Sequence, residues 1–365
     1  MHLILNMILF CINKLGVGGA ERVFIKDANA LSIMGQQVFF CILFGEKKDQ
    51  TLLSDLKLSS ENIFYAEAKN LFDFNALSRV SNFTKSKNIK TVYSTLNEAN
   101  IFSRFLKTWN SKLEIIIREA NISDPKPIKF KFLDVVLNLF VKKIVCVSEE
   151  VRTSLLEYQP FYKSKMEVLP NGVEIPLIWK DYSLTNSPIK ILNVGSLTSK
   201  KGHKYLIEAC SIVQKENPNS FILDLVGDGA ERENLENLVK EKKLSDKITF
   251  SGQISPELVK EKYLSSDIFV LSSLWEGSPN VLLEAMAHGL VCISTRVSGA
   301  LGMIEDGVSG FLVVKGDSQN LANKMLDVIK NKQNFKTIST NARRQIEQNF
   351  AYPIYIKRLE NILNS

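Results

Sequence analysis

Two glutamates in one short stretch have the chemistry to hold the hydroxyl groups of a sugar or a ribose. Glu276 and Glu284 stand with seven residues between them, and a carboxylate can accept two hydrogen bonds from neighbouring hydroxyls. The sequence predicts a helix that begins between them, with Ser278 as its N-cap and Pro279 at its first position. Because a helix N-terminus attracts anions such as phosphate, the stretch suits a sugar nucleotide. The alternative is a capped helix with two solvated glutamates.

Lysines and glycines elsewhere in the chain could serve a diphosphate. Lys200 and Lys201 follow the apolar run 191–194, and a lysine ahead of a helix presents a point charge to phosphate. For Lys200, a solvated surface position is the alternative. Gly18 and Gly19 lie between an apolar run and a helical pattern, where glycine lets the backbone approach a phosphate closely. Short glycine turns join strands to helices for steric reasons at least as often.

Polar side chains follow the apolar run 113–118. Arg118, Glu119 and Asn121 therefore stand at the edge of a predicted parallel sheet, where ligands usually bind. We interpret these three residues as candidate contacts on the acceptor side. Each could equally be a charged or polar strand end that faces water.

A basic amphipathic segment covers residues 126–143. Apolar residues dominate it, Asp134 is its only acid, and five lysines flank the apolar run: Lys126, Lys129, Lys131, Lys142 and Lys143. Segments of this type rest on anionic lipid headgroups, so we predict a membrane contact through Lys126 to Lys143. The alternative is an ordinary helix on the first sheet with lysines at its rim.

Strand-like apolar runs alternate with helix-length amphipathic segments along the whole chain. The strand candidates are 7–12, 38–44, 91–94, 113–118 and 143–148 in the first half, and 189–194, 221–226, 248–251, 268–271 and 291–294 in the second. This alternation predicts an α/β protein with parallel sheets. We expect Rossmann-like domains at 1–175 and 186–348, and a C-terminal helix at 349–365 that returns to the first.

Length and composition agree with a two-domain globular protein. The chain has 365 residues, of which 45% are hydrophobic and 23% charged, and its net charge is +7. Modest basicity is compatible with a nucleic acid, an anionic membrane or an anionic substrate. Five cysteines without a paired spacing indicate buried thiols in a reducing compartment. No apolar run reaches the ~18 residues that a membrane-spanning helix needs.

The stretch 267–289 resembles the signature of a known family. With Trp275-Glu276-Gly277 and Glu284-Ala285-Met286-Ala287, it is similar to glycosyltransferase family 4, whose members are retaining, nucleotide-sugar-dependent enzymes of the GT-B fold. The resemblance implies two Rossmann-like domains with a cleft between them. The chain departs from the family pattern at Ser196, where arginine is common, and at Gly302, where glutamate is common.

The resemblance also implies roles for individual residues. Glu276 and Lys201 would be catalytic, with Glu276 orienting the sugar and Lys201 stabilising the leaving phosphate, while Glu284 would hold the ribose. The implied donor-binding residues are Gly18, Gly19, Ser196, Lys201, Gly227, Gln253, Ile254, Glu276, Gly277, Ser278, Pro279, Asn280, Val281 and Glu284. We expect no metal and no cofactor, because lysine and a helix N-terminus can neutralise a leaving diphosphate.

The function implied is transfer of a sugar from a nucleoside-diphosphate donor, most simply a UDP-sugar, to a glycan or lipid-linked acceptor. Retention is expected, in bacterial-type surface polysaccharide, lipopolysaccharide or glycan biosynthesis. We expect a cytoplasmic protein that meets the inner face of the membrane and binds no nucleic acid. The alternatives are a sugar-nucleotide epimerase of the same architecture and a non-catalytic protein that binds sugar nucleotides or membranes.

Overall fold

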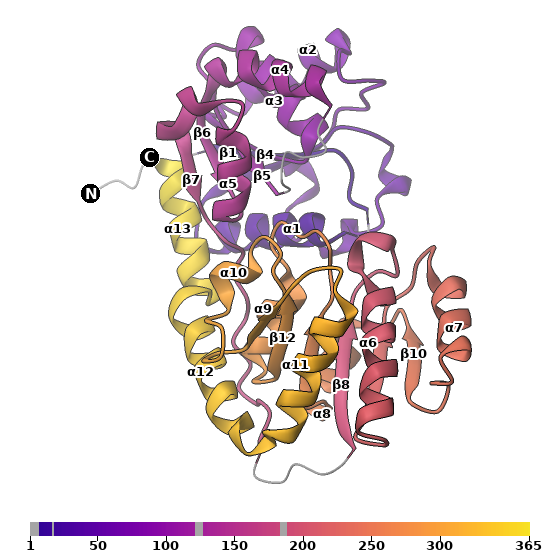
Figure 1. The fold of residues 1–365 in the computed structure, drawn as a ribbon. Helices are drawn as coiled ribbons and strands as arrows, with labels where there is room; N and C mark the ends of the chain where they lie inside the picture. The colour runs from indigo at the N-terminus through magenta and orange to yellow at the C-terminus, as the bar shows by residue number, and fades with distance from the viewer. Residues whose placement is uncertain (1–6, 17, 121–126, 183–187) are drawn as a thin grey trace. The chain divides into compact units, whose positions relative to one another are not determined.

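The chain folds into two compact units. A computed structural model describes residues 7–16, 18–120, 127–182 and 188–365 (Figure 1). The first unit holds Met1–Asn171 and Pro353–Ser365, and the second holds Gly172–Tyr352. These divisions differ from the predicted boundaries at 175, 186 and 349. The linker that the sequence predicts near 172–188 begins with residues that belong to the second unit, and residues 183–187 lie outside the described part.

The first unit is built on a seven-stranded parallel sheet of order β3-β2-β1-β4-β5-β6-β7. Its strands are β1 (Met7–Ile12), β2 (Gln37–Ile42), β3 (Ile63–Tyr65), β4 (Thr91–Thr95), β5 (Glu114–Glu119), β6 (Val141–Cys146) and β7 (Met166–Val168). Its helices are α1 (Gly19–Ile33), α2 (Phe74–Ser86), α3 (Asn97–Trp109), α4 (Ile128–Leu137), α5 (Glu149–Leu156) and α13 (Tyr352–Asn364). Short 3₁₀ helices include η4 (Asn138–Phe140) and η5 (Pro160–Lys165).

The second unit is built on a six-stranded parallel sheet of order β10-β9-β8-β11-β12-β13. Its strands are β8 (Ile189–Val194), β9 (Phe221–Val226), β10 (Ile248–Gly252), β11 (Ile268–Leu271), β12 (Val291–Thr295) and β13 (Phe311–Val313). Its helices are η6 (Ser199–Lys201), α6 (His203–Glu216), α7 (Arg232–Glu241), α8 (Pro256–Ser265), α9 (Asn280–Ala287), α10 (Ala300–Met303), α11 (Ser318–Lys330) and α12 (Phe335–Asn349).

Both sheets are buried, which explains why their strands read as continuous apolar runs. Helices pack around each sheet (Figure 1), so a central strand such as β1 is fully buried from Ile8 to Ile12. Strands covered on both faces need apolar side chains at every position. The prediction of parallel α/β layering in both halves is confirmed.

The last helix, α13, packs within the first unit. The Tyr355 hydroxyl donates to a carboxylate oxygen of buried Asp27 on α1 at 2.6 Å, and Gln36 donates to Glu360 at 2.8 Å. Burial is the main cause that raises the pKa of Tyr355 well above its ordinary value. The hydroxyl therefore stays a donor, and this bond helps fix the C-terminal helix.

Candidate functional site

The second sheet has a topological switch point at β8. This strand pairs with β9 on one side and β11 on the other, so the loops that follow β8 and β11 diverge at the carboxyl edge of the sheet. Ligands of open α/β sheets bind in the crevice outside such a point. Lys201 follows β8 and Glu276 follows β11, which brings the two predicted catalytic residues to this edge.

Lys201 and Glu276 contact each other directly. The Lys201 Nζ lies 2.5 Å from Glu276 Oε1, and the Ser273 hydroxyl donates to the same oxygen at 2.7 Å. The side chains of Lys201 and Glu276 are only 19% and 13% exposed. Since the second oxygen of Glu276 is not used in these two bonds, the carboxylate keeps acceptor capacity for a hydroxyl.

The two loops are also tied through their backbones. The Leu274 N–H donates to the Lys200 carbonyl at 2.8 Å, and the Ser272 hydroxyl donates to the Lys201 carbonyl at 3.0 Å. Gly202 has a φ of 65°, and an added Cβ would lie 2.2 Å from the Ser272 carbonyl oxygen. The close approach of the loops thus requires glycine there, and it holds Lys201 beside Glu276.

Glu284 is oriented by a residue that the sequence did not single out. Tyr263, on α8 and 1% exposed, donates its hydroxyl to Glu284 Oε2 at 3.0 Å. Its ring stacks on His288 with centroids 5.0 Å apart. Burial and, next, the Glu284 charge raise the pKa of Tyr263 well above its usual value, so the hydroxyl remains a donor and fixes the carboxylate.

The helix that carries Glu284 begins one residue later than predicted. Pro279 is the N-cap of α9 and Asn280 its first residue, so the assignment of Ser278 as N-cap was wrong. The Ser278 hydroxyl is buried and has no hydrogen-bond partner among the described residues. Pro279 can cap because its extended ψ of 91° lies outside the helical region. The first amides of α9 have no partner within the helix, so its start remains suited to an anion.

The loops after β9 and β10 bring three more predicted donor residues to the same edge. Gly227, after β9, has a φ of 137°, and a Cβ there would lie 2.0 Å from the Gly195 carbonyl oxygen. Gly227 is thus required for packing of the two loops. Gln253 is exposed and Ile254 half-buried just beyond β10. The side chains of Ser196 and Lys200 are exposed.

His203 is buried just after the loop that carries Lys201. It is the first residue of α6 and 2% exposed, and its Nε2 lies 3.0 Å from Asn193 Oδ1. Asn193 in turn donates to the Val270 carbonyl on β11 at 2.8 Å. Burial and, to a smaller degree, the Lys201 charge lower the pKa of His203 from 6.5 to about 4, so a neutral imidazole bridges β8, β11 and α6.

In the first unit, Gly18 is the N-cap of α1 and Gly19 its first residue. Arg118 does not face water as a strand end, because it is 1% exposed and its guanidinium donates to the side chain of Asn171. This contact favours a structural role in place of the predicted acceptor contact. Asn121 lies outside the described residues.

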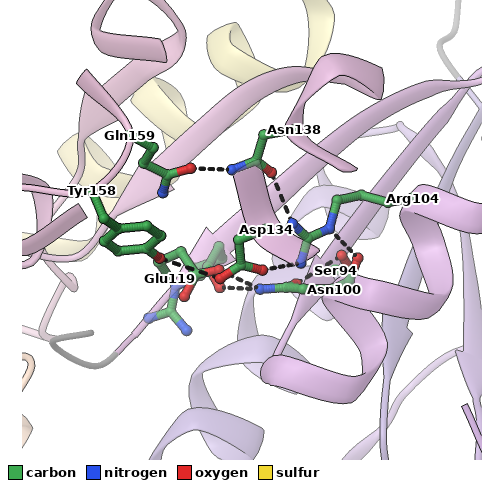
Figure 2. Close-up of polar contacts among 9 residues, drawn as sticks. Ser94, Asn100, Arg104, Glu119, Asp134, Asn138, Tyr158 and Gln159 are labelled. Carbon is green, nitrogen blue, oxygen red and sulfur yellow. Dashed lines mark hydrogen bonds and ion pairs between the residues drawn. The ribbon is translucent and has the colours of Figure 1, made fainter. Parts of the chain in front are cut away.

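Glu119 ends β5 and joins a polar network inside the first unit (Figure 2). Asn100 on α3 donates to Glu119 Oε1 at 3.1 Å and to the Arg118 carbonyl at 3.1 Å. The Ser94 hydroxyl donates to Asn100 Oδ1 at 2.9 Å. Glu119 is half-buried, so its carboxylate is positioned at the carboxyl edge of the first sheet.

The basic segment 126–143 is not one amphipathic helix. It contains α4, η4 and the start of β6, and Lys126 lies outside the described residues. Lys142 and Lys143 belong to β6 and pair with Glu114 at 2.9 Å and Glu167 at 3.2 Å. These two lysines therefore already have acidic partners in the sheet, which does not favour them as part of the predicted membrane contact.

The sequence of the second unit is similar to a known family. Residues 177–345 match the model of the family described as glycosyl transferases group 1. This range includes Lys201, Glu276 and Glu284. The second unit is therefore similar to this family over most of its length.

Relatives of the chain are glycosyltransferases by name. The amylovoran biosynthesis glycosyltransferase AmsK of Erwinia amylovora is 34% identical over 184 residues, which cover 49% of this chain and 45% of AmsK. An uncharacterized glycosyltransferase of Haemophilus influenzae is 28% identical over 361 residues, covering 97% and 98%. The UDP-Gal:alpha-D-GlcNAc-diphosphoundecaprenol alpha-1,3-galactosyltransferase of Escherichia coli is 27% identical over 248 residues, covering 64% and 62%. The match thus spans less than half of AmsK and nearly all of the Haemophilus protein.

Solved structures show the same fold. The crystal structure of HepE from Anabaena in complex with UDP has a TM-score of 0.82 at 21% identity, covering 98% of this chain and 99% of HepE. HepE has also been solved in complex with UDP-glucose. Two parallel-sheet, Rossmann-like domains that match these structures are the GT-B fold, as the family resemblance implied.

Proposed function

We propose that this chain is a retaining glycosyltransferase that moves a sugar from a UDP-sugar to a glycan or lipid-linked acceptor. The observation that carries the proposal is the gathering of Lys201, Glu276 and Glu284 at the carboxyl edge of the second sheet, beside the start of α9. A cation and two carboxylates around an anion-binding helix terminus suit a diphosphate flanked by two sugars.

The donor would lie along this edge with its ribose at Glu284 and its diphosphate at the start of α9. Backbone groups near Gln253 and Ile254 would hold the base. Tyr263 donates to one oxygen of Glu284 at 3.0 Å, which fixes the carboxylate that would accept from the ribose hydroxyls. The complexes of HepE with UDP and UDP-glucose support a uridine nucleotide.

The transfer step requires stabilisation of a leaving diphosphate. The bond from the anomeric carbon to the phosphate oxygen breaks with both electrons going to that oxygen, while the acceptor hydroxyl forms the new bond. Its proton passes to the departing phosphate oxygen on the same face, which gives retention without an enzymic nucleophile. An ammonium has three N–H donors, so Lys201 can hold Glu276 and a phosphate oxygen together, and the mechanism needs no metal.

The acceptor and the setting follow from the kinds of protein that this chain resembles. The named relatives act in amylovoran biosynthesis and on a diphosphoundecaprenol-linked sugar, which supports surface polysaccharide or lipopolysaccharide biosynthesis for this chain. We place the protein in the cytoplasm at the inner face of the membrane. In the described ranges no helix is long and apolar enough to span a bilayer.

A donor panel tests the proposal. The full chain is incubated with UDP- and GDP-sugars, with and without glycan and lipid-diphosphate acceptors, and the nucleotides are separated by chromatography. We expect release of UDP that depends on the acceptor, with an α-linked product from an α-linked donor. Conversion of one sugar nucleotide into another without acceptor would identify an epimerase. Binding without any turnover would identify a non-catalytic protein.

A further inference from the structure

Helix α4 carries polar side chains on the face that it turns toward the first unit. Asp134 and Asn138, at its end and in the η4 turn that follows, are only 2% and 1% exposed. Arg104 on α3 is fully buried between them, as Figure 2 shows, with its guanidinium 2.8 Å from Asp134 Oδ1 and 2.9 Å from Asn138 Oδ1. The inner face of α4 is therefore anchored by charge and hydrogen bonds.

Further bonds fix α4 in this rotation. Asn138 donates to Gln159 at 2.6 Å, the Tyr158 hydroxyl donates to Asp134 at 3.2 Å (Figure 2), and the Tyr162 hydroxyl donates to the Val135 carbonyl at 2.8 Å. Buried polar groups that lose these partners are costly. A rotation that moved the apolar side of α4 inward would break all of them.

The outward side of α4 is consequently apolar. Ile128, Phe132 and Val136 follow at four-residue spacing on one face, and they are 86%, 73% and 42% exposed. The exposed apolar side chains continue through η4 and onto the neighbouring η5 with Leu139, Phe140 and Phe161. Large exposed apolar groups that cluster in this way mark a surface that meets a membrane or a protein.

Positive charge accompanies these apolar groups. The segments 128–140 and 160–165 contain four lysines, Lys129, Lys131, Lys163 and Lys165, and Asp134 is their only acid. Asp134 is buried against Arg104, whereas Lys163 is exposed. Lys165 is half-buried and its Nζ donates to the Asn138 carbonyl at 2.8 Å. We call the six exposed apolar residues together with Lys131 and Lys163 the α4 surface.

We propose that the α4 surface docks this protein on an anionic lipid bilayer, with its aromatic and aliphatic side chains in the headgroup region and its lysines on lipid phosphates. Apolar insertion together with a basic border is the combination that holds peripheral proteins on such membranes. The proposal rests on the proposed function in one respect: docking on the membrane would bring the candidate site to a lipid-linked acceptor.

Charge favours lipid over a second copy of the chain. In a two-fold symmetric dimer the same surface meets itself, so the lysines of one copy would lie near those of the other. Like charges at an interface oppose association. An anionic bilayer accepts the same lysines favourably.

Vesicle sedimentation with the full chain tests the proposal at low salt. Vesicles that contain phosphatidylglycerol should bind the protein, and vesicles of phosphatidylcholine alone should bind it much less. Phe132→Ser should lower the partition coefficient by roughly tenfold, and Lys163→Glu by at least about fivefold, at about 1 kcal/mol per lysine charge.

Matched variants outside the surface serve as controls. Phe74→Ser removes an aromatic on α2 that is 67% exposed, and Lys85→Glu reverses an exposed lysine of the same helix; both should bind as the wild type does. The emission of a Phe132→Trp variant should move to shorter wavelength on vesicles beyond any change in the wild type. Thermal unfolding establishes that each variant is folded.

The proposal is overturned if the wild type ignores anionic vesicles, or if Phe74→Ser weakens binding as much as Phe132→Ser. It is also overturned if Phe132→Ser converts a dimer into a monomer in light scattering, because a second copy would then cover the surface. Vesicle binding needs no donor. Vesicle binding without sugar transfer would support the membrane role of the α4 surface and contradict the proposed glycosyltransferase activity. Transfer to a soluble acceptor without vesicle binding would support the activity and contradict the membrane role.

Discussion

The side chains of the candidate donor site constrain one another. Glu276 is held by Lys201 and Ser273, and Glu284 is held by Tyr263. Both carboxylates therefore have a fixed orientation, and a fixed acceptor loses less entropy when it binds a hydroxyl.

We predict that Glu284→Ala weakens binding of UDP by roughly tenfold or more. The change removes the acceptor for the ribose hydroxyls, and a hydrogen bond to a charged group contributes about 1.5–3 kcal/mol. Isothermal calorimetry measures the affinity. Glu216→Ala, which removes an exposed glutamate of α6, is the control and should leave it unchanged. Equal affinities for all three proteins would remove Glu284 from the ribose site.

Tyr263→Phe should weaken UDP binding by a smaller factor, on the order of fivefold, because Glu284 stays present but loses its orienting donor. Since the hydroxyl touches the carboxylate and not the donor, we expect a raised KM for the donor with kcat nearly unchanged. Steady-state kinetics separate the two constants. A large loss of kcat at constant KM would mean that Tyr263 acts on the transition state instead.

His203 gives the fold a specific dependence on pH. Because burial lowers the pKa of His203 from 6.5 to about 4, the unfolded chain binds a proton below pH 6.5 that the folded chain does not. The stability that depends on neutral His203 is fully present above pH 6.5. As the pH falls toward 4, the free energy of unfolding decreases by about 2–3 kcal/mol.

Urea unfolding of the wild type and of His203→Gln, near pH 7 and near pH 4.5, measures this contribution. The wild type should lose more stability on acidification than the variant does. Any contribution of His288 to this loss is the same in the two proteins, because both contain it. A variant that loses as much stability as the wild type would show that His203 titrates normally in the folded protein.

At the scale of elements, burial decides what the sequence could predict. The ranges 7–12, 189–194, 221–226 and 268–271 were predicted to the residue. The first and the last are unbroken apolar runs, and the other two are mostly apolar with one or two polar residues among them. The strands β3, β7 and β13 were missed. Each has three residues and lies at an end of its sheet. Its apolar run is therefore too short to distinguish from a loop.

The candidate site shows the same limit. Glu276, Glu284 and Lys201 were found because they follow apolar strands or a capped helix in the sequence. Tyr263 and Ser273 were not, since their roles depend on contacts between segments. The segment 126–143 was predicted as one amphipathic unit, whereas it divides into α4, η4 and the start of β6. The buried pair of Arg104 and Asp134 that anchors α4 is a contact between segments, which the sequence pattern does not show.

We predict that Arg104→Met destabilises the first unit by about 3–5 kcal/mol, because it leaves buried Asp134 without a counter-charge. The double variant Arg104→Met with Asp134→Leu should recover part of this loss. Chemical denaturation compares the three proteins. If the single change costs less than about 1 kcal/mol, the pair does not hold α4 in place.

For the whole molecule, the decisive question is whether it catalyses transfer or only binds a nucleotide sugar. The GT-B fold is compatible with both, since fold alone does not define function. Lys201 separates them, because charge grows on the diphosphate oxygens as the bond to the sugar breaks, and a cation placed there helps the transition state most.

The most direct test is kcat for acceptor-dependent UDP release by Lys201→Ala and Lys200→Ala, measured with a donor and acceptor that the wild type uses. We predict that Lys201→Ala lowers kcat by about 10²–10³-fold, while Lys200→Ala, which changes an exposed neighbour, is nearly neutral. If Lys201→Ala retains the wild-type kcat, Lys201 does not stabilise the leaving diphosphate and the central claim is contradicted.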